Sequence, residues 1–319
     1  MGSGNREWRE GGASALTGAS PQRPLARVLE DHAAWLEQRG GGVRANLCGA
    51  ALSEASLEGA NLRGALLRSA ILLEARLSGA DLRGADLQDA DLRQAVMTGV
   101  DLTGANLAGA NLQLSLLAEA NLSEAALDRC SLRGANLREA RLLDASLHGV
   151  DFTNAFLQRA GLHHARALGC DFSNATLEGA VFYHAHLQTC RLVACKADDA
   201  NFSFTRIQGC DFRNAQLSAA RFFKADLSRS CFARALMGGC DLREARLAAA
   251  EFFDALLTGA RFGEAALHTA DLRGANLRGA RELTALQLAQ ARTDNSTILP
   301  SGRRGPFLKG SQDERPTLR

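Results

Sequence analysis

A period of five residues constrains this chain more than any other feature of its sequence. A large apolar residue, usually Leu or Phe, recurs at every fifth position from Leu47 to Leu277, about 47 times without an insertion. Only Ala167 and Ala197 leave this slot without a large apolar side chain. A small residue, usually Ala, stands two positions earlier, so one five-residue motif repeats over most of the chain.

A five-residue period fits neither regular element. Five residues turn an α-helix by about 500°, so an apolar column would drift around its surface. In a flat strand, an odd period would place successive leucines on opposite faces. The pattern works if each unit is a short extended wall followed by a bend. The small residue and the leucine then both point inward, and glycines such as Gly59 and Gly64 suit a bend that needs positive φ.

The distinctive residues predict the length of one coil. Several cysteines and two sets of phenylalanines recur at multiples of twenty residues, which indicates vertical columns and four walls in each coil. These residues are Cys130, Cys170, Cys190 and Cys210; Phe152, Phe172, Phe212, Phe232 and Phe252; and Phe182, Phe202, Phe222 and Phe262. The two Phe columns lie ten residues apart, so we expect them on opposite walls, facing the centre. Coils stacked at about 4.8 Å would pair like neighbouring strands.

This motif resembles that of the pentapeptide-repeat family over residues 45–280, roughly three quarters of the chain. The resemblance implies an all-β solenoid, a right-handed quadrilateral β-helix, here of about twelve coils with short capping helices at both ends. The family hosts unrelated roles, so the motif predicts the fold far better than the function. Members often dimerise through C-terminal elements, which makes a homodimer a further expectation.

The first coil needs a cover because its edge would otherwise be open. Residues 24–42 predict an amphipathic helix that ends at a run of three glycines, with Trp35 over the first coil. A capping helix is the expected reading, and a partner-binding helix is the alternative. Residues 1–23 are polar and rich in Gly and Ser, and we expect them to be disordered.

The opposite end shows the same change of pattern. The repeat domain is expected over residues 43–282, where the apolar slot fails at Glu282. A cap is predicted over 283–300, opened by Thr284 as the N-cap of a short helix. Residues 301–319 are polar, with basic residues, Gly and Pro, and are predicted to form a disordered tail.

Composition and charge indicate which cellular compartment and which classes of partner to expect. The net charge of +2 argues against broad attraction to nucleic acid, and no apolar run is long enough for a signal peptide or a membrane span. Eight cysteines without a secretion signal favour reduced thiols. We therefore expect a cytoplasmic protein, with no direct binding to nucleic acid or membranes.

No motif for catalysis, cofactor binding or metal binding is found. The glycine spacing of a phosphate-binding loop arises from the repeat itself, and no Lys-Ser or Lys-Thr follows it. Six cysteines fall in the inward small slot, where Cys acts as a slightly larger Ala. The chain is therefore predicted not to be an enzyme, and no cofactor or metal is expected.

One corner of the coil departs from the habits of the repeat. Most corners carry Gly, Ser, Arg or Glu, but this one carries apolar, aromatic and imidazole groups over several coils. We call it the corner strip, and its members are Leu143, His163, His164, Tyr183, His184, Phe204 and Phe223. Clustered exposed apolar groups are typical of a partner surface, although scattered surface aromatics are also ordinary. A metal site on Asp144, His164 and His184 is disfavoured because stacked parallel side chains rarely surround an ion.

Two classes of function fit these observations. The first is a bacterial adaptor or scaffold that presents side chains to another protein along a rigid rod. The alternative, implied by the resemblance, is protection of DNA gyrase by imitation of a DNA duplex. Residues 45–280 carry about 24 basic and 26 acidic residues, whereas duplex DNA of the expected length of some 55 Å would carry about thirty negative charges. Charge therefore favours the first class. Imidazoles in the corner strip predict binding that weakens as the pH falls through about 6.5, if the partner surface is apolar.

Overall fold

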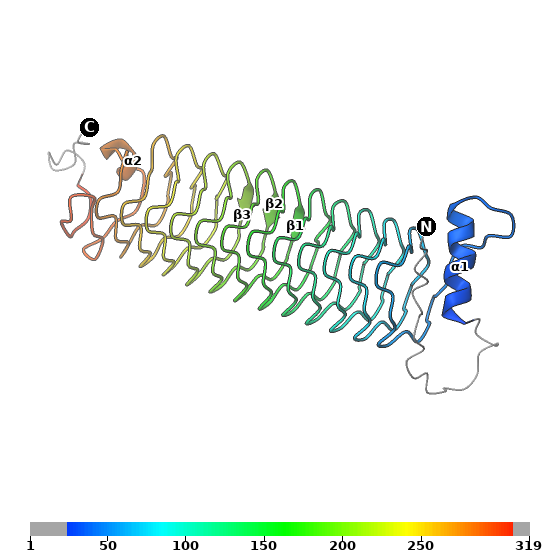
Figure 1. Ribbon diagram of the computed structural model, residues 1–319. Coiled ribbons are helices and arrows are strands. Elements are labelled where there is room, and N and C mark those ends of the chain that lie inside the picture. The colour runs from blue at the N-terminus through cyan, green and yellow to red at the C-terminus, as the bar shows by residue number, and fades with distance from the viewer. Residues whose placement is uncertain (1–23, 309–319) are drawn as a thin grey trace, which may run out of the picture.

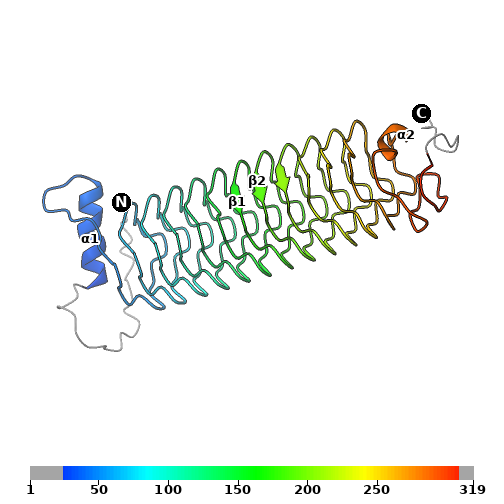
Figure 2. The same cartoon turned by 180° about the vertical axis from the view of Figure 1, so that it is seen from behind.

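The computed structural model describes residues 24–308 as one long stack of coils with a helix at each end (Figure 1). Helix α1 spans Leu25–Leu36, and the short helix α2 spans Ala285–Leu288. Three short strands, β1 (Arg166–Leu168), β2 (His186–Gln188) and β3 (Arg206–Gln208), lie side by side near the middle of one wall. The same stack is seen from behind in Figure 2.

Backbone pairing follows a register of twenty residues. Strands β1, β2 and β3 pair in parallel, with Arg166 opposite His186 and His186 opposite Arg206. Isolated parallel bridges repeat this offset along the repeat region, for example between residues 61 and 81. Because each unit has five residues, one coil holds four units. The backbones of neighbouring coils hydrogen-bond like parallel strands, so each coil is a template for the next.

The inward positions are those that the repeat predicts. Leucines and phenylalanines of the five-residue slot and the small residues before them are buried along the stack. The Phe172 and Phe182 rings meet edge to face, with ring centroids 6.1 Å apart, so the two Phe columns do face each other. Within a column the rings stack in parallel, as Phe202 and Phe222 do at 5.1 Å. Ala167 and Ala197 are also buried, beside these larger neighbours.

The bends place one residue of each unit in the left-handed region. Gly64 has φ of 68°, and His164 and Phe204 have φ of 58° and 60° at the same corner of later coils. Glycine adopts this conformation without strain, whereas a residue with a Cβ is disfavoured there. The repeat nevertheless tolerates many non-glycine side chains at this position, because the backbone bonds between coils fix the bend.

Helix α1 covers the first coil through the buried His32 and through Leu25, Val28 and Leu29, which are partly buried against the core. His32 is buried, and its Nδ1 accepts a hydrogen bond of 3.1 Å from the backbone N–H of Ala45. Trp35, expected over the coil, stacks on His32 at 5.4 Å but remains 39 % exposed. The chain then turns back so tightly that a Cβ on Gly42 would collide with the backbone of Trp35. The glycine run therefore ends the helix by allowing this close approach.

The C-terminal end is closed by side chains that reach the last coil. Thr284 is the N-cap of α2, and it exchanges hydrogen bonds with Gln287 in a capping box. The Gln287 amide also donates to two backbone carbonyls of the coil below, those of Phe262 and Ala265. These contacts satisfy acceptors that an open edge would leave unpaired.

The segment expected to begin a disordered tail is ordered at its start. Ile298 pairs with Arg304 in an antiparallel bridge, and the backbone N–H of Phe307 donates to the Thr293 hydroxyl at 2.8 Å. The polar composition of this segment did not predict that the chain folds back here. Backbone hydrogen bonds hold this short segment in place. The rest of the predicted tail, from residue 309, and the predicted N-terminal segment lie outside the described residues.

Candidate surface for partner binding

Five of the seven residues of the corner strip form one continuous group of rings on the outside of the rod. The His164 and His184 rings stack with centroids 5.3 Å apart, and Phe204 follows at 5.1 Å from His184. Tyr183 meets both His184 and Phe204 edge to face, at 4.4 and 5.3 Å. Phe223 extends the group by an edge contact with Phe204 at 5.5 Å. Residues from four successive coils therefore make a single aromatic ladder.

Most of the strip is half-buried rather than fully exposed. Leu143 is 42 % exposed and His164 is also exposed, but His163, Tyr183, His184, Phe204 and Phe223 are intermediate. The cause is the ring stacking itself, since each ring shields its neighbours. The corner positions of the repeat predicted exposed side chains at these residues. The contacts show that they stabilise one another, by about 0.5–1.5 kcal/mol for each aromatic pair.

Cationic side chains cover one end of the strip. The Lys224 ammonium lies 5.0 Å from the centre of the Phe223 ring, and the Arg243 guanidinium lies 5.6 Å from it. Both cations have acidic partners, Lys224 with Glu244 at 3.3 Å and Arg243 with Asp241 at 2.6 Å. These contacts fix the ring of Phe223 in place. The strip is thus ordered before any partner arrives.

The metal site considered at this corner finds no support in the geometry. Among residues 24–308, no group of three His, Cys, Asp or Glu side chains is arranged to hold a metal ion. His164 and His184 instead stack ring on ring, which directs their nitrogens along parallel planes. Such an arrangement does not converge on a single ion.

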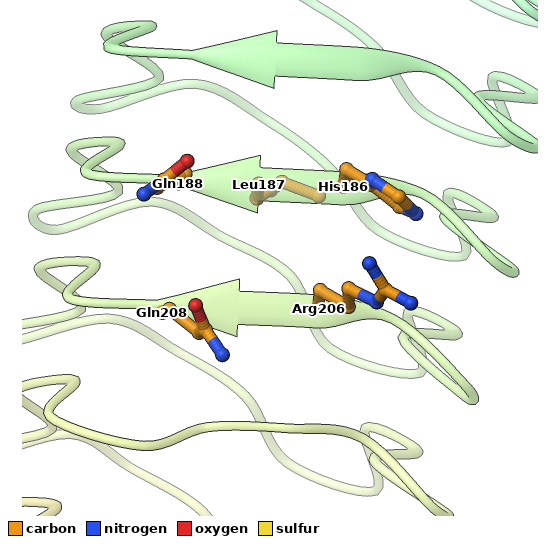
Figure 3. A pocket seen from close by; sticks show the side chains of 5 residues that line it. All are labelled: His186, Leu187, Gln188, Arg206 and Gln208. Carbon is orange, nitrogen blue, oxygen red and sulfur yellow. The ribbon is translucent and has the colours of Figure 1, made fainter.

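A basic ladder next to the strip was not predicted from the sequence. It consists of Arg166, His186 and Arg206, the first residues of β1, β2 and β3, and all three are exposed. In Figure 3, His186 and Arg206 lie at the start of neighbouring strands, with Gln188 and Gln208 at their ends. Partial burial, together with the positive charges of Arg206 and Arg166 and the nearby His164, holds the pKa of His186 below its ordinary value.

The sequence did contain a signal for this ladder. Residues 163–169, 183–189 and 203–209 include four of the seven histidines but not one Asp or Glu. These three segments lie in register, one above another, and contain the ladder and most of the strip. The ladder can be recognised in the sequence when charged residues, like the aromatic residues, are aligned at a spacing of twenty.

A column of acidic residues on the next wall differs from the basic ladder, because several of its charges are paired. Its members are Asp91, Asp151, Asp171, Asp211, Glu251 and Asp271. In three of these units, an arginine stands two residues later on the same wall. Asp91, Asp211 and Asp271 each form an ion pair at 2.6 Å with the arginine two residues later. These hydrogen bonds hold the pKa of Asp91 and of Asp271 below the ordinary value. Much of the column is therefore neutralised within its own wall.

A Ser–His–Asp group on the surface does not form a catalytic triad. Ser146 Oγ and Asp128 Oδ1 lie 2.9 and 2.8 Å from the same nitrogen, Nδ1 of His148, and Ser146 donates to Asp128 at 2.7 Å. In a triad, the serine and the carboxylate contact different ring nitrogens, so that the imidazole can pass a proton between them. This cluster is a local hydrogen-bond network between two coils.

Four of the buried cysteines, Cys130, Cys170, Cys195 and Cys210, are unreactive. Burial raises the pKa of the Cys130 thiol and of the Cys195 thiol to about 12. The neighbouring Cys190 thiol and burial also raise the pKa of Cys170 and Cys210. A thiol that stays protonated is a poor nucleophile and a poor metal ligand, so these four cysteines pack as small apolar residues.

Comparison with known proteins identifies the family. The family model described as pentapeptide repeats matches in 8 copies within residues 43–154 and 250–281, and a related pentapeptide repeat region matches residues 165–241. These matches cover more than half of the chain, which therefore belongs to the pentapeptide repeat family. None of the curated proteins compared with the chain matches it.

Solved structures of this family are similar to parts of the chain. A pentapeptide repeat protein, Rfr23, from the cyanobacterium Cyanothece 51142 is 26% identical over 30% of this chain and 63% of its own, with a TM-score of 0.27. This chain thus covers less than two thirds of that protein. A pentapeptide repeat protein from the Arabidopsis thaliana thylakoid lumen is 20% identical over 36% of this chain and 79% of its own, at 0.27. Full-length QnrB1, a plasmid-mediated fluoroquinolone resistance protein, is 18% identical over 63% of this chain and 94% of its own, at 0.21.

Proposed function

We propose that this protein is a non-enzymatic adaptor that binds another protein through the corner strip. The observation that carries the proposal is the continuous ring ladder from His164 to Phe223 on the outer surface. Aromatic side chains held in place by their neighbours lose little conformational entropy when a partner covers them. They are also the groups that most often dominate the free energy of binding.

The rod supplies the rigid support that an adaptor needs. We propose that its cross-section is quadrilateral, with about twelve coils of four walls each. Side chains of one column then stand about 4.8 Å apart along a fixed line, since neighbouring coils pair like strands. The eight cysteines are unpaired among the described residues, which fits a reducing compartment such as the bacterial cytoplasm. No helix of residues 24–308 has the length and apolar character to cross a membrane.

Protection of gyrase by imitation of DNA is the weaker candidate. A mimic needs a dense and unpaired line of negative charge, about one charge per 1.7 Å of axis. Here Asp91, Asp211 and Asp271 are each paired with an arginine of the same wall. The pairing removes much of the acidic column from the field that a DNA-binding enzyme would meet. We therefore favour the adaptor.

The test is the capture of a partner by a variant of the strip. The parent is used as bait in an affinity pull-down, and its partner is identified by mass spectrometry. The combined variant Tyr183→Ser, Phe204→Ser and Phe223→Ser is expected to lose that partner. It should remain folded, with a slightly lower melting temperature, because the three rings pack on one another outside the core.

A control variant removes three exposed apolar side chains elsewhere. Leu114, Leu116 and Phe156 are 56%, 43% and 39% exposed, and all lie off the strip. Their replacement by serine should leave capture unchanged. If the strip variant is folded by circular dichroism and still captures the partner, the proposed surface is wrong. Loss of capture in both variants would show that general hydrophobicity, not the strip, is responsible.

A further inference from the structure

The basic ladder and the central part of the corner strip lie in three segments that contain no acidic residue. Segments 163–169, 183–189 and 203–209 lie in parallel register and contain no Asp or Glu. In the ladder column, Arg166, His186 and Arg206 follow one another in consecutive coils. Neighbouring strands are about 4.7–4.9 Å apart, a spacing at which adjacent positive charges repel.

Within residues 24–308, the ladder has no acidic partner for its charge. Neither Arg166 nor Arg206 forms an ion pair within residues 24–308. The next acid along the column is Asp226, opposite Arg206. Its carboxylate accepts hydrogen bonds instead from the Gln208 amide at 2.8 Å and from the Ser228 backbone at 3.1 Å. The guanidinium groups thus remain available to an external anion.

A shallow hollow lies between the second and third rungs of the ladder. It has a volume of about 140 Å³ and is lined by His186, Leu187, Gln188, Arg206 and Gln208 (Figure 3). Water occupies about 30 Å³ per molecule in the liquid, so the hollow has room for a few waters or for one carboxylate group. Guanidinium, imidazole and amide groups around it can all donate hydrogen bonds to oxygen.

We propose that this surface binds a carboxylate-rich segment of a partner protein. Arg166 and Arg206 pair with carboxylates of that segment, and His186 donates a hydrogen bond between them. Apolar residues next to those carboxylates pack on the corner strip, whose residues stand two or three positions before each rung. This inference rests on the proposed function, because it names the chemistry of the partner that the strip would hold.

A peptide fits the surface better than a nucleic acid does. Single-stranded nucleic acids need open ring faces on which bases stack, along an extended basic groove. Here the Tyr183 and Phe204 rings meet at 67° and the Phe204 and Phe223 rings at 83°, so ring faces are covered by neighbouring edges. The ladder also ends after three coils, since Asp226 follows Arg206 in the column.

The imidazole at the centre gives the binding a definite dependence on pH. The groups that face His186 are Arg166 and Arg206 on the adjacent strands and His164 at the corner, and all of them disfavour its protonated form. A bound carboxylate has the opposite effect and stabilises the imidazolium. Affinity should therefore increase as the pH falls from about 7.5 to 5.5, where carboxylates stay ionised. An apolar partner would show the reverse trend.

The experiment measures binding of a fluorescein-labelled hexaglutamate peptide to the full chain by fluorescence anisotropy at low salt. The expected result is binding that weakens with added salt and strengthens toward pH 5.5. The double variant Arg166→Gln and Arg206→Gln should bind at least about tenfold more weakly, because it loses two charge-assisted contacts. Hexaglutamine and a short labelled oligothymidylate serve as alternative probes.

The control variant removes two arginines from the opposite corner. Arg133 and Arg234 are exposed, lie about half a coil away from the strip and form no ion pair among the described residues. Arg133→Gln with Arg234→Gln therefore matches the change in net charge and should retain binding. Equal loss in both variants, equal binding of hexaglutamine, or tighter binding of the oligothymidylate would each overturn the proposal.

The strip variant separates this inference from the proposed function. Tyr183→Ser, Phe204→Ser and Phe223→Ser leave every residue of the ladder in place. This variant should still bind hexaglutamate while it loses the natural partner. If hexaglutamate fails to bind the parent, the carboxylate inference is wrong, whereas the adaptor proposal is decided by the pull-down alone.

Discussion

The acidic column and the basic ladder lie on adjacent walls of one rod. Acids of the column form ion pairs within their own wall, whereas the arginines of the ladder form none among the described residues. Asp91, Asp211 and Asp271 each hold an arginine two residues along the same wall. Arg166 and Arg206 hold no acid within the part of the chain described. The backbone has the same twenty-residue register on both walls, so the difference in ion pairing comes from the side chains alone. A repeat that pairs its own charges presents little to a partner, whereas one that leaves them unpaired can bind an opposite charge.

The largest expected effect tests the core on which both walls depend. Leu132 is fully buried, and Leu132→Asp places a charge without a partner in an apolar interior, at a cost of several kcal/mol. We expect the coils around it to unfold, with loss of the β signal in circular dichroism at room temperature.

The matched change at the surface is Leu143→Asp, since Leu143 is 42 % exposed. It should alter the free energy of unfolding by no more than about 0.5 kcal/mol. Similar melting of the two variants would show that the assignment of inward and outward positions is wrong.

A moderate effect is expected from acid. The arginine hydrogen bonds lower the pKa of Asp91 and Asp271 in the folded state, so the stability they contribute is present above the unfolded pKa of about 3.9. It is lost as the pH falls through the lower folded values. Each pair is partly exposed to solvent, so its contribution to stability is small. The melting temperature should fall between pH 5 and 2.5.

The double variant Asp91→Asn and Asp271→Asn identifies the source of that decline. It should melt at a lower temperature than the parent at pH 6, and its melting temperature should change less on acidification. The basic ladder provides the contrast, because Arg166→Gln and Arg206→Gln should leave the slope with pH unchanged. An unchanged slope in the Asp variant would mean that these pairs contribute nothing to stability.

The smallest expected effect concerns gyrase. The paired acidic column predicts no inhibition of DNA supercoiling by purified gyrase at micromolar concentrations of this protein. Arg93→Gln, Arg213→Gln and Arg273→Gln together would expose the column, and this variant is the informative comparison. Inhibition by the parent would contradict the charge argument and favour the DNA-mimic function.

The sequence predicted the repeat fold well because the repeat is local and regular. The slot that contains Leu132, and the column spacing of Phe172 and Phe182, both follow from five-residue units and a twenty-residue coil. The ends were predicted less completely. His32, rather than Trp35, is the buried contact of α1, because which face of a helix meets a coil depends on where the chain turns at Gly42.

The candidate surface was predicted only in part, for a physical reason. The corner strip stands out because aromatic residues are rare in this chain, at 5%. The ladder does not stand out, since arginine is common and its meaning depends on whether an acid lies near it in space. The pairing of Asp226 with Gln208 rather than Arg206 depends on side-chain conformation, which no periodicity encodes. Ring stacking that half-buries Phe204 is likewise a property of the folded coil.

The twenty-residue register has a consequence for how such a rod can change in evolution. An insertion of five residues would preserve every inward position, so the chain would still fold. It would, however, rotate all later columns by one wall, and Arg206 would no longer stand below Arg166 and His186. An insertion of twenty would lengthen the rod and keep the phase of its surfaces. Which residues share a surface thus depends on the number of five-residue units between them. Selection on binding must act on that number as well as on the residues themselves.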